Sequence, residues 1–272
     1  MRKILFVLSL LLTAPLAGCL DFSEDEDPVV RILTYDIAAF SEEMFSTFTN
    51  QTGYEIEVVK ADDAGGILTQ LLQTKDAPQF DLAIGLDNTY LQTALDAGLF
   101  AEHNTNVSGV SSTALEPYNG PFAVPFDRGD VCLNYDESRV DGENLTVPTS
   151  LWNLTEPEWN GLVAFPSPLT SSPGRAFMTA TVDYFENDAN NTTDAFDWWE
   201  AVADNDAIFT SGWTEAYEIH YSGGYGEWIT GHIGDAAMTV SYCHSPGVEA
   251  YYNSNSTKST SLTLPRATFH QV

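Results

Sequence analysis

The apolar positions between residues 31 and 100 change their period several times. Short apolar or alternating runs predict strands at residues 31–35, 54–59 and 80–86, the last of the buried parallel kind. Apolar residues on one helical face predict a helix after Ser41 that ends before Thr52-Gly53, and further helices at residues 65–72 and 89–97. Ser41 and Asn88 can cap two of these helices, and Gly53 and Gly98 lie just past their ends. This alternation predicts a parallel sheet with crossover helices.

The second half of the chain continues with the same kinds of element. Strands are predicted at residues 131–135, 162–165 and 236–242. Helices are predicted after Ser150, after Ser171, and over residues 194–202 and 213–221. The last six residues alternate apolar and polar positions, which is typical of a strand. We therefore expect an α/β protein with two lobes, at residues 30–126 and 127–260, joined near Val124–Asp127, and a return strand to the first lobe at residues 261–272.

The N-terminus reads as an export signal. Arg2 and Lys3 precede an apolar run, Ile4–Leu12, that is too short to span a bilayer. Leu16-Ala17-Gly18-Cys19 resembles a lipobox, in which Cys19 carries the lipid and begins the mature chain. The alternative is an ordinary signal peptide with a chance cysteine. We expect residues 1–19 to be a lipoprotein signal peptide, residues 20–29 an acidic tether, and the protein to sit on the outer face of the cytoplasmic membrane.

The net charge of the chain limits the kinds of molecule that it can bind. The chain of 272 residues carries 39 acidic and 10 basic side chains, a formal net charge of −29. Such a surface repels nucleic acid and anionic membranes, and it favours cationic ligands or a high-salt medium. A solvated acidic coat with no chemistry of its own is the simplest interpretation. Apolar residues make up 43%, enough to form a real core.

Signatures of catalysis and of metal binding are missing from the sequence. It contains no G-x-S-x-G, P-loop, G-x-G-x-x-G, C-x-x-C or H-E-x-x-H motif, and its histidines lack metal-ligand spacing. We expect no cofactor and no metal. Cys132 and Cys243 can pair in an oxidising compartment, but the sequence does not show that they are close. Seven N-x-S/T sequons lend weak support to export.

Aromatic and acidic residues gather at the ends of predicted strands, where open α/β sheets bind ligands. They are Tyr35, Asp36, Asp62, Asp63, Asp87, Asn88, Asp127 and Tyr242. Trp213 and Tyr217 are four residues apart and share a helix face. Taken singly, each aromatic is more simply a core residue, and each aspartate a cap or turn residue. Their joint placement points to a flat cationic ligand, because rings stack on it and carboxylates balance its charge.

The segment Ser171-Ser172-Pro173-Gly174 is a second candidate. A serine cap followed by proline begins a helix, and free N–H groups at such a start bind anions. A capped helix with no further role is an equally good interpretation.

Seven motifs resemble the thiamine-binding solute receptors of ABC importers. In chain order they are TYD at 34–36, IGLDN at 84–88, DAGLF at 96–100, VPFDRG at 124–129, TSSPG at 170–174, SGWTEAY at 211–217 and SYCHSP at 241–246. The resemblance covers most of residues 31–272. It implies a type II periplasmic-binding-protein fold of two lobes, with parallel-rich sheets flanked by helices, that traps its ligand in a cleft.

The resemblance also implies roles for single residues. Tyr35 and Asp63 would line the cleft, Trp213 and Tyr242 would pack against the ligand rings, and Ser171 would meet the hydroxyethyl or phosphate end. Asp36, Ser172, Gly174 and Tyr217 are further candidates. The implied partners are thiamine or its phosphates and an ABC permease in the membrane. We expect a monomer that binds no nucleic acid and is not an enzyme.

The chain departs from the family in three places. Val248 stands where the family carries a tyrosine, which Tyr251 or Tyr252 would have to replace. The stretch between Tyr217 and Ser241 is longer, and the family continues beyond residue 272, so we expect a C-terminally truncated relative.

Other functions stay open at this point. The same fold could bind ferric iron through adjacent tyrosines, or a polyamine. A thiamine-degrading enzyme that uses Cys132 as nucleophile is less favoured, because its neighbours are acidic apart from Arg128 and do not stabilise a thiolate. A purely adhesive surface protein fits the sequons but not the α/β alternation.

Overall fold

The computed structural model describes residues 28–187 and 193–272. The predicted signal peptide, the lipidated Cys19, most of the tether and the sequons at Asn190 and Asn191 lie outside the described residues. The described residues divide into two compact units, residues 28–29 with 41–56 and residues 30–40 with 57–187 and 193–272, and each is described by itself.

The smaller unit contains helix α2 (Glu42–Thr52). Ser41 caps it as predicted, since its side chain accepts a hydrogen bond from the N–H of Met44 at 3.2 Å. Gly53 ends the helix with φ 76°, a left-handed conformation that suits glycine.

A three-stranded sheet carries the first candidate residues, with β1 (Val29–Tyr35) between β2 (Glu55–Ala61) and β3 (Leu82–Ala83). β1 and β3 are parallel, as the alternation of predicted strands and helices indicates. Ile32 of β1 lies opposite Leu82 of β3. The helices that follow are α3 (Ala64–Gln73), α4 (Leu91–Asp96) and α5 (Ser112–Leu115).

Two predictions in this region are wrong in detail. The buried strand expected at 80–86 is only two residues long, and the Leu82 side chain is 48% exposed, because β3 forms the edge of its sheet and pairs with β1 alone. Asn88 does not cap α4. Asp87 accepts the N–H of Thr89 at 2.6 Å instead, while the N–H of Asn88 donates to the carbonyl of Val272 at 3.0 Å.

The larger sheet has six strands in the order β6-β5-β7-β4-β8, and β9 also pairs with β4. The strands are β4 (Gly129–Asp136), β5 (Val163–Pro166), β6 (Ile208–Thr210), β7 (Met238–Tyr242), β8 (Ser259–Leu262) and β9 (Phe269–Gln271). β5 is parallel to β6 and β7, whereas β4 is antiparallel to β7, β8 and β9. The strand predicted at the end of the chain is therefore present as β9, while the predicted domain boundaries stay predictions.

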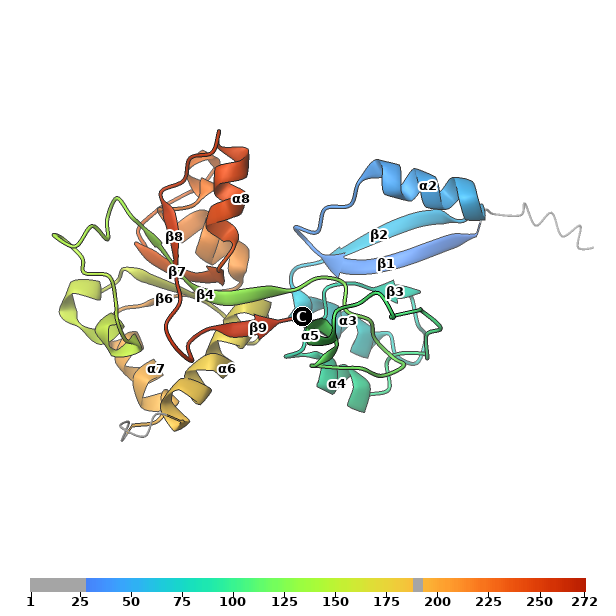
Figure 1. The fold of residues 1–272 in the computed structure, drawn as a ribbon, viewed down its shortest axis with the longest axis horizontal. Coiled ribbons are helices and arrows are strands. Elements are labelled where there is room, and N and C mark those ends of the chain that lie inside the picture. The colour runs from blue at the N-terminus through green and yellow to red at the C-terminus, as the bar shows by residue number, and fades with distance from the viewer. Residues whose placement is uncertain (1–27, 188–192) are drawn as a thin grey trace, which may run out of the picture. The chain divides into compact units, whose positions relative to one another are not determined.

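Neighbouring residues of β5 show what covers each face of this sheet. Phe165 packs on Phe177 and Trp198, which belong to α6 (Ser172–Glu186) and α7 (Ala195–Asp204). Ala164 packs on Ala216 in the π-helix η3 (Glu215–His220), which occupies most of the helix predicted at 213–221. In Figure 1 the strands β4, β6 and β7 run between α6 and α7 below and α8 (Ser245–Tyr252) above. The 3₁₀ turns are η1 (Leu151–Thr155), η2 (Pro157–Trp159) and η4 (Tyr225–Trp228).

Candidate functional site

A cleft of about 2120 Å³ collects most of the predicted site residues within the larger unit. Its wall includes Tyr35, Asp36, Asp63, Ser172, Trp213, Tyr217 and Tyr242. They come from the end of β1, the starts of α3 and α6, the η3 segment and the end of β7. The structure thus brings together residues that lie up to about two hundred positions apart in the sequence.

Asp63 lies at the N-terminus of α3, in the wall of this cleft. Its Oδ1 accepts the N–H of Ala64 at 2.9 Å and caps α3. Burial raises the pKa of Asp63 to about 6, and the nearby carboxylate of Asp87 adds to the rise. Its ionised form therefore lacks a neutralising cation among the described residues, which a cation in the cleft would supply.

Tyr35 and Tyr242 face the same group of carboxylates. Burial raises the pKa of the Tyr35 phenol, and the carboxylates of Asp127 and Asp63 raise it further. Burial also raises the pKa of Tyr242, with the carboxylates of Asp63 and Asp87 as the next causes. Asp127, expected only to shape the crossover, therefore lies in the cleft wall with both tyrosines.

The start of α6 is built differently from the prediction. Ser171 is fully buried and caps the helix, and it does not line the cleft. Gly174 is a packing residue, because a Cβ there would come within 2.3 Å of the Pro166 carbonyl oxygen. Neither residue is placed to touch a ligand, and Ser172 is the member of this segment that reaches the cleft.

Trp213 and Tyr217 form an aromatic pair. Their ring centroids are 4.8 Å apart and their planes differ by 12°, so the rings are stacked as the four-residue spacing predicts. The indole Nε1 of Trp213 donates a hydrogen bond to Ser241 Oγ at 2.8 Å. Since both rings line the cleft and Tyr217 is buried, Trp213 presents an oriented aromatic surface to a ligand.

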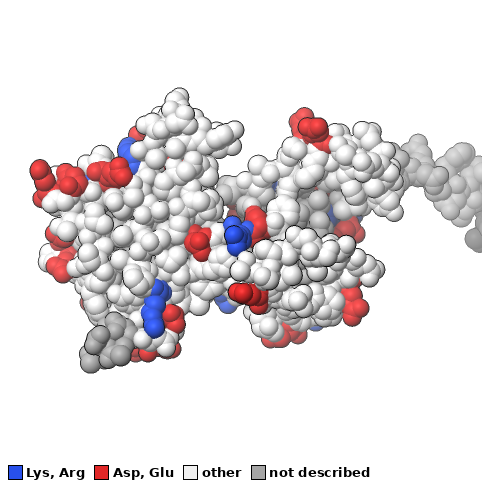
Figure 2. Space-filling model, in the orientation of Figure 1, with Lys and Arg blue, Asp and Glu red and all other residues white. Residues whose placement is uncertain are grey.

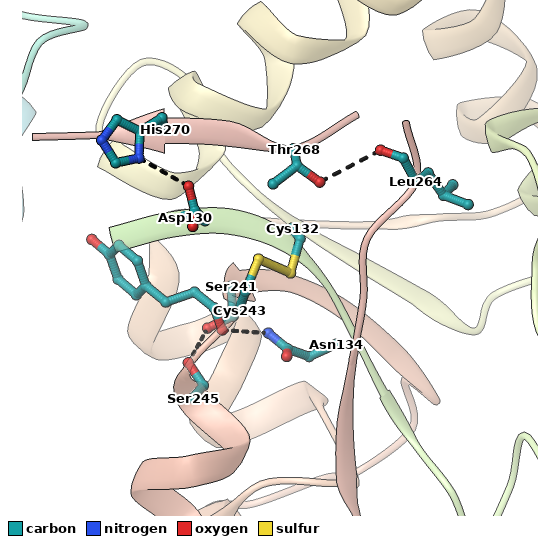
Figure 3. Close-up of a disulfide and its surroundings, with 10 residues drawn as sticks. Asp130, Cys132, Asn134, Ser241, Cys243, Ser245, Leu264, Thr268 and His270 are labelled. Carbon is teal, nitrogen blue, oxygen red and sulfur yellow. Dashed lines mark hydrogen bonds and ion pairs between the residues drawn. A yellow bond between two sulfur atoms is a disulfide. The ribbon is translucent and has the colours of Figure 1, made fainter. Parts of the chain in front are cut away.

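A disulfide joins Cys132 in β4 to Cys243 just after β7 (Figure 3). Two further contacts hold the same strand end: Asn134 Nδ2 donates to the carbonyl of Tyr242 at 3.1 Å, and Ser241 Oγ lies 3.0 Å from Ser245 Oγ. The sequence left this pairing open. The disulfide fixes the backbone on both sides of Tyr242, and it leaves Cys132 without the free thiol that a nucleophile needs.

Carboxylates dominate the wall of the cleft. Among the described residues that line it, Arg128 is the one lysine or arginine, against nine acidic residues: Asp36, Asp62, Asp63, Asp81, Asp87, Glu102, Asp127, Glu215 and Glu249. Figure 2 shows acidic side chains in scattered groups over the face in view, with few basic ones. The acidity of the cleft is therefore part of a general acidic surface and is available to a cationic ligand.

Sequence reasoning missed four acidic residues of the cleft wall: Asp81, Glu102, Glu215 and Glu249. Glu215 accepts from the N–H of Ser211 at 2.8 Å, and bonds from Ser211, its side chain first, lower the pKa of Glu215. Glu249 is buried beside Tyr217, and burial raises the pKa of Glu249. Two signals were available: Glu215 belongs to the SGWTEAY motif at 211–217, and Glu249 follows Val248, the position of the missing family tyrosine.

The structure bears on the alternative ligands. Within the described residues no group of three or more His, Cys, Asp and Glu side chains is placed to hold a metal ion. Tyr251 and Tyr252, the adjacent tyrosines considered for iron, are 77% and 82% exposed on α8.

In the part of the chain that the structure describes, no helix combines the length and apolarity needed to cross a membrane.

Comparison with solved structures concerns the fold. A periplasmic thiamin binding protein superposes with a TM-score of 0.73 at 24% identity, covering 90% of this chain and 71% of that one. The chain therefore has the periplasmic-binding-protein fold, which confirms the predicted fold class.

Comparison with characterised sequences concerns the family. A thiamine-binding periplasmic protein of Escherichia coli is 28% identical over 253 residues, which is 90% of this chain and 67% of that protein. Its counterpart in Salmonella typhimurium is 26% identical over 226 residues, and this chain spans 61% of its length. Residues 43–243 match the family described as bacterial extracellular solute-binding protein, a family of binding proteins and not of enzymes. The chain belongs to the family of bacterial extracellular solute-binding proteins.

Proposed function

We propose that this protein captures thiamine, a flat aromatic cation, outside the cytoplasmic membrane and delivers it to an ABC importer. Two relatives that carry the name thiamine-binding periplasmic protein support the choice of ligand. The observation that carries the proposal is the combination of a stacked aromatic pair and a strongly acidic wall in one cleft.

Each part of the cleft suits one property of the ligand. A ring of thiamine stacks on the face of Trp213 that Tyr217 does not cover, and Tyr242 packs against the ligand from the end of β7. The positive charge of the thiazolium offsets the carboxylates of Asp63 and Asp127, which have no basic partner within hydrogen-bond distance among the described residues. Tyr35 lies with these two carboxylates and closes the same part of the wall.

Attachment to the membrane is a further part of the proposal. Leu16-Ala17-Gly18-Cys19 supports lipidation of Cys19 after export, and an acidic tether then follows. Such an anchor keeps the receptor next to a permease in the same membrane.

Titration of thiamine into the purified chain tests the proposal, with heat and tryptophan fluorescence as two readouts. We expect saturable one-to-one binding with quenching, weakened at least 30-fold in Trp213→Ala. Tyr251→Ala is the control, because this side chain is exposed and does not line the cleft. Saturable binding of spermidine or ferric iron with no response to thiamine would show that the ligand is wrong.

A further inference from the structure

The glycine-rich segment between η3 and β7 is held tightly against η3. The N–H groups of Ile233 and Gly234 both donate to the carbonyl of Ile219, at 2.8 and 2.9 Å. Gly226 lies directly on η3, because a Cβ there would come within 2.2 Å of the carbonyl oxygen of Glu218. Hydrogen bonds at the end of the segment and a close backbone approach in its middle therefore fix the turn η4 in place.

A series of aromatic rings leads from the stacked pair of the cleft to η4. The ring of Tyr217, which is stacked on Trp213, lies 6.0 Å from the ring of Tyr225 in η4. The hydroxyl of Tyr225 donates to Glu218 Oε1, so this ring is held at both of its ends. The turn η4 thus continues the aromatic wall that begins at Trp213.

Trp228 ends η4 and presents a free indole to the cleft. It follows Tyr225 by three residues, and a 3₁₀ helix has three residues per turn, so the two side chains leave η4 on the same side. Both of them line the cleft. Trp228 is 63% exposed, and among the described residues its ring packs on no other aromatic ring and its Nε1 donates to no acceptor.

The other tryptophans of the chain all lie among the described residues and are buried or half-buried: Trp152, Trp159, Trp198, Trp199 and Trp213. A single exposed apolar side chain is common on a protein surface and needs no explanation by itself. Trp228 differs because it lies on a fixed turn in the wall of an acidic cleft, next to the aromatic series. Contact with a flat ligand would remove apolar area of its ring from water without breaking any existing ring contact.

We propose that Trp228 is a second aromatic contact for the ligand and packs its indole against bound thiamine from the η4 side of the cleft. The inference rests on the function proposed above and adds a residue that determines ligand affinity. Thiamine carries a cationic thiazolium and a neutral pyrimidine ring, so it offers a second ring when the first is stacked on Trp213. Indole is the aromatic side chain that attracts a cation most strongly, and the fixed position of η4 limits the conformational entropy that Trp228 loses on binding.

Calorimetric titration of thiamine into two variants at this position tests the contact. We expect Trp228→Ala to weaken thiamine binding about 10-fold or more, because the whole ring is lost. Trp228→Phe keeps an aromatic face and should stay within about 3-fold of the wild type. Phe196→Ala is the matched control, since this aromatic side chain on α7 is 75% exposed and does not line the cleft.

Hydroxyl-radical labelling read by mass spectrometry reports on the indole itself. Trp228 is the exposed one of the chain's six tryptophans, so it should be oxidised readily in the free protein. Saturating thiamine should reduce its oxidation about five-fold or more, because a stacked ligand covers a face of the ring. Oxidation of Phe196 should stay unchanged in the same samples. A merely structural role of Trp228 would not produce this protection.

Two results would overturn the inference and leave the proposed function standing. One is unchanged thiamine affinity in Trp228→Ala. The other is equal oxidation of Trp228 with and without thiamine, which would mean that any loss of affinity in the variant is indirect. Absence of thiamine binding by the wild type would overturn the proposed function, and the inference with it.

Discussion

The indole of Trp213 is held on two sides, by the ring of Tyr217 at 4.8 Å and by Ser241 Oγ, which accepts its N–H at 2.8 Å. The first contact is local, between residues four apart. The second comes from β7, 28 residues further along the chain. Together they fix the plane of the ring before a ligand arrives, and a preorganised ring loses less conformational entropy on binding.

Removal of the Ser241 hydroxyl should therefore weaken the binding of thiamine, because this hydroxyl holds the Trp213 ring in place. We expect Ser241→Ala to reduce thiamine affinity roughly 5-fold or more, because an unpaired indole N–H costs about 1–3 kcal/mol or lets the ring turn. Titration calorimetry measures the change. Thr239→Ala is the matched control, since Thr239 is buried on the same face of β7 and its hydroxyl donates to the carbonyl of Ala164 instead of meeting Trp213. Equal losses in both variants would mean that the effect comes from general destabilisation of the strand.

The raised pKa of Asp63 predicts a pH-dependent stability. The folded pKa of about 6 exceeds the ordinary value of 3.8, so between these values the native state binds a proton that the unfolded state has released. The free energy of unfolding should then fall as pH rises through this window. Relative to Asp63→Asn, the wild type should lose up to about 3 kcal/mol between pH 4 and pH 7.

Urea unfolding of both proteins at pH 4.5, 5.5, 6.5 and 7.5 checks this. The uncharged variant keeps an acceptor at the cap of α3, so the difference isolates the charge. If the free energies of unfolding of the wild type and Asp63→Asn change in parallel over this pH range, the predicted pKa shift of Asp63 is contradicted.

The Cys132–Cys243 disulfide should stabilise the larger unit. The two cysteines are 111 residues apart, and closing a loop of that length restricts the unfolded chain by about 4–5 kcal/mol in the entropic model. We expect the double variant Cys132→Ser/Cys243→Ser to unfold at lower urea concentration and to bind thiamine more weakly, because the backbone around Tyr242 is less constrained. Identical urea midpoints for the double variant and the oxidised wild type would count against this role.

Lipidation of Cys19 can be tested independently of the folded structure. In cells that process lipoproteins, Cys19→Ser should move the protein from the membrane fraction to the soluble extracytoplasmic fraction and abolish incorporation of labelled fatty acid. The physical reason is that acyl chains supply the membrane affinity. Ser23→Ala, in the adjacent tether, is the control. A Cys19→Ser protein that still fractionates with the membrane would show that something other than this lipid holds it there.

Local sequence signals predicted much of the fold. Ser41 and Ser171 each cap the helix that was expected after them, Asp194 caps the helix that was expected to begin at this residue, and Gly53 adopts the left-handed conformation that ends α2. Such signals act over three or four residues, so they are readable from the chain alone. The prediction was weaker for residues 80–86, where burial was inferred from apolar character and the strand is in fact a short sheet edge.

Some of the site was predictable for the same reason. The stacking of Trp213 on Tyr217 follows from their spacing on one helical turn, and Tyr35 and Tyr242 follow from their places at strand ends. Ser171 was an expected ligand contact, but the structure buries it as a cap. A capping motif looks the same in sequence whether or not the residues beside it are reachable from a cleft.

The sequence by itself determined the helix and strand pattern, the helix caps, the acidic character of the chain and the aromatic pair, because each depends on neighbouring residues or on composition. Only the tertiary structure decided the bond between Cys132 and Cys243 and the joining of Asp87, Ser172 and Gln271 into one cluster. These contacts span 85 to 184 positions of the chain. No local propensity encodes such a distance, because the register of β4 with β7 and the position of α6 bring the partners together.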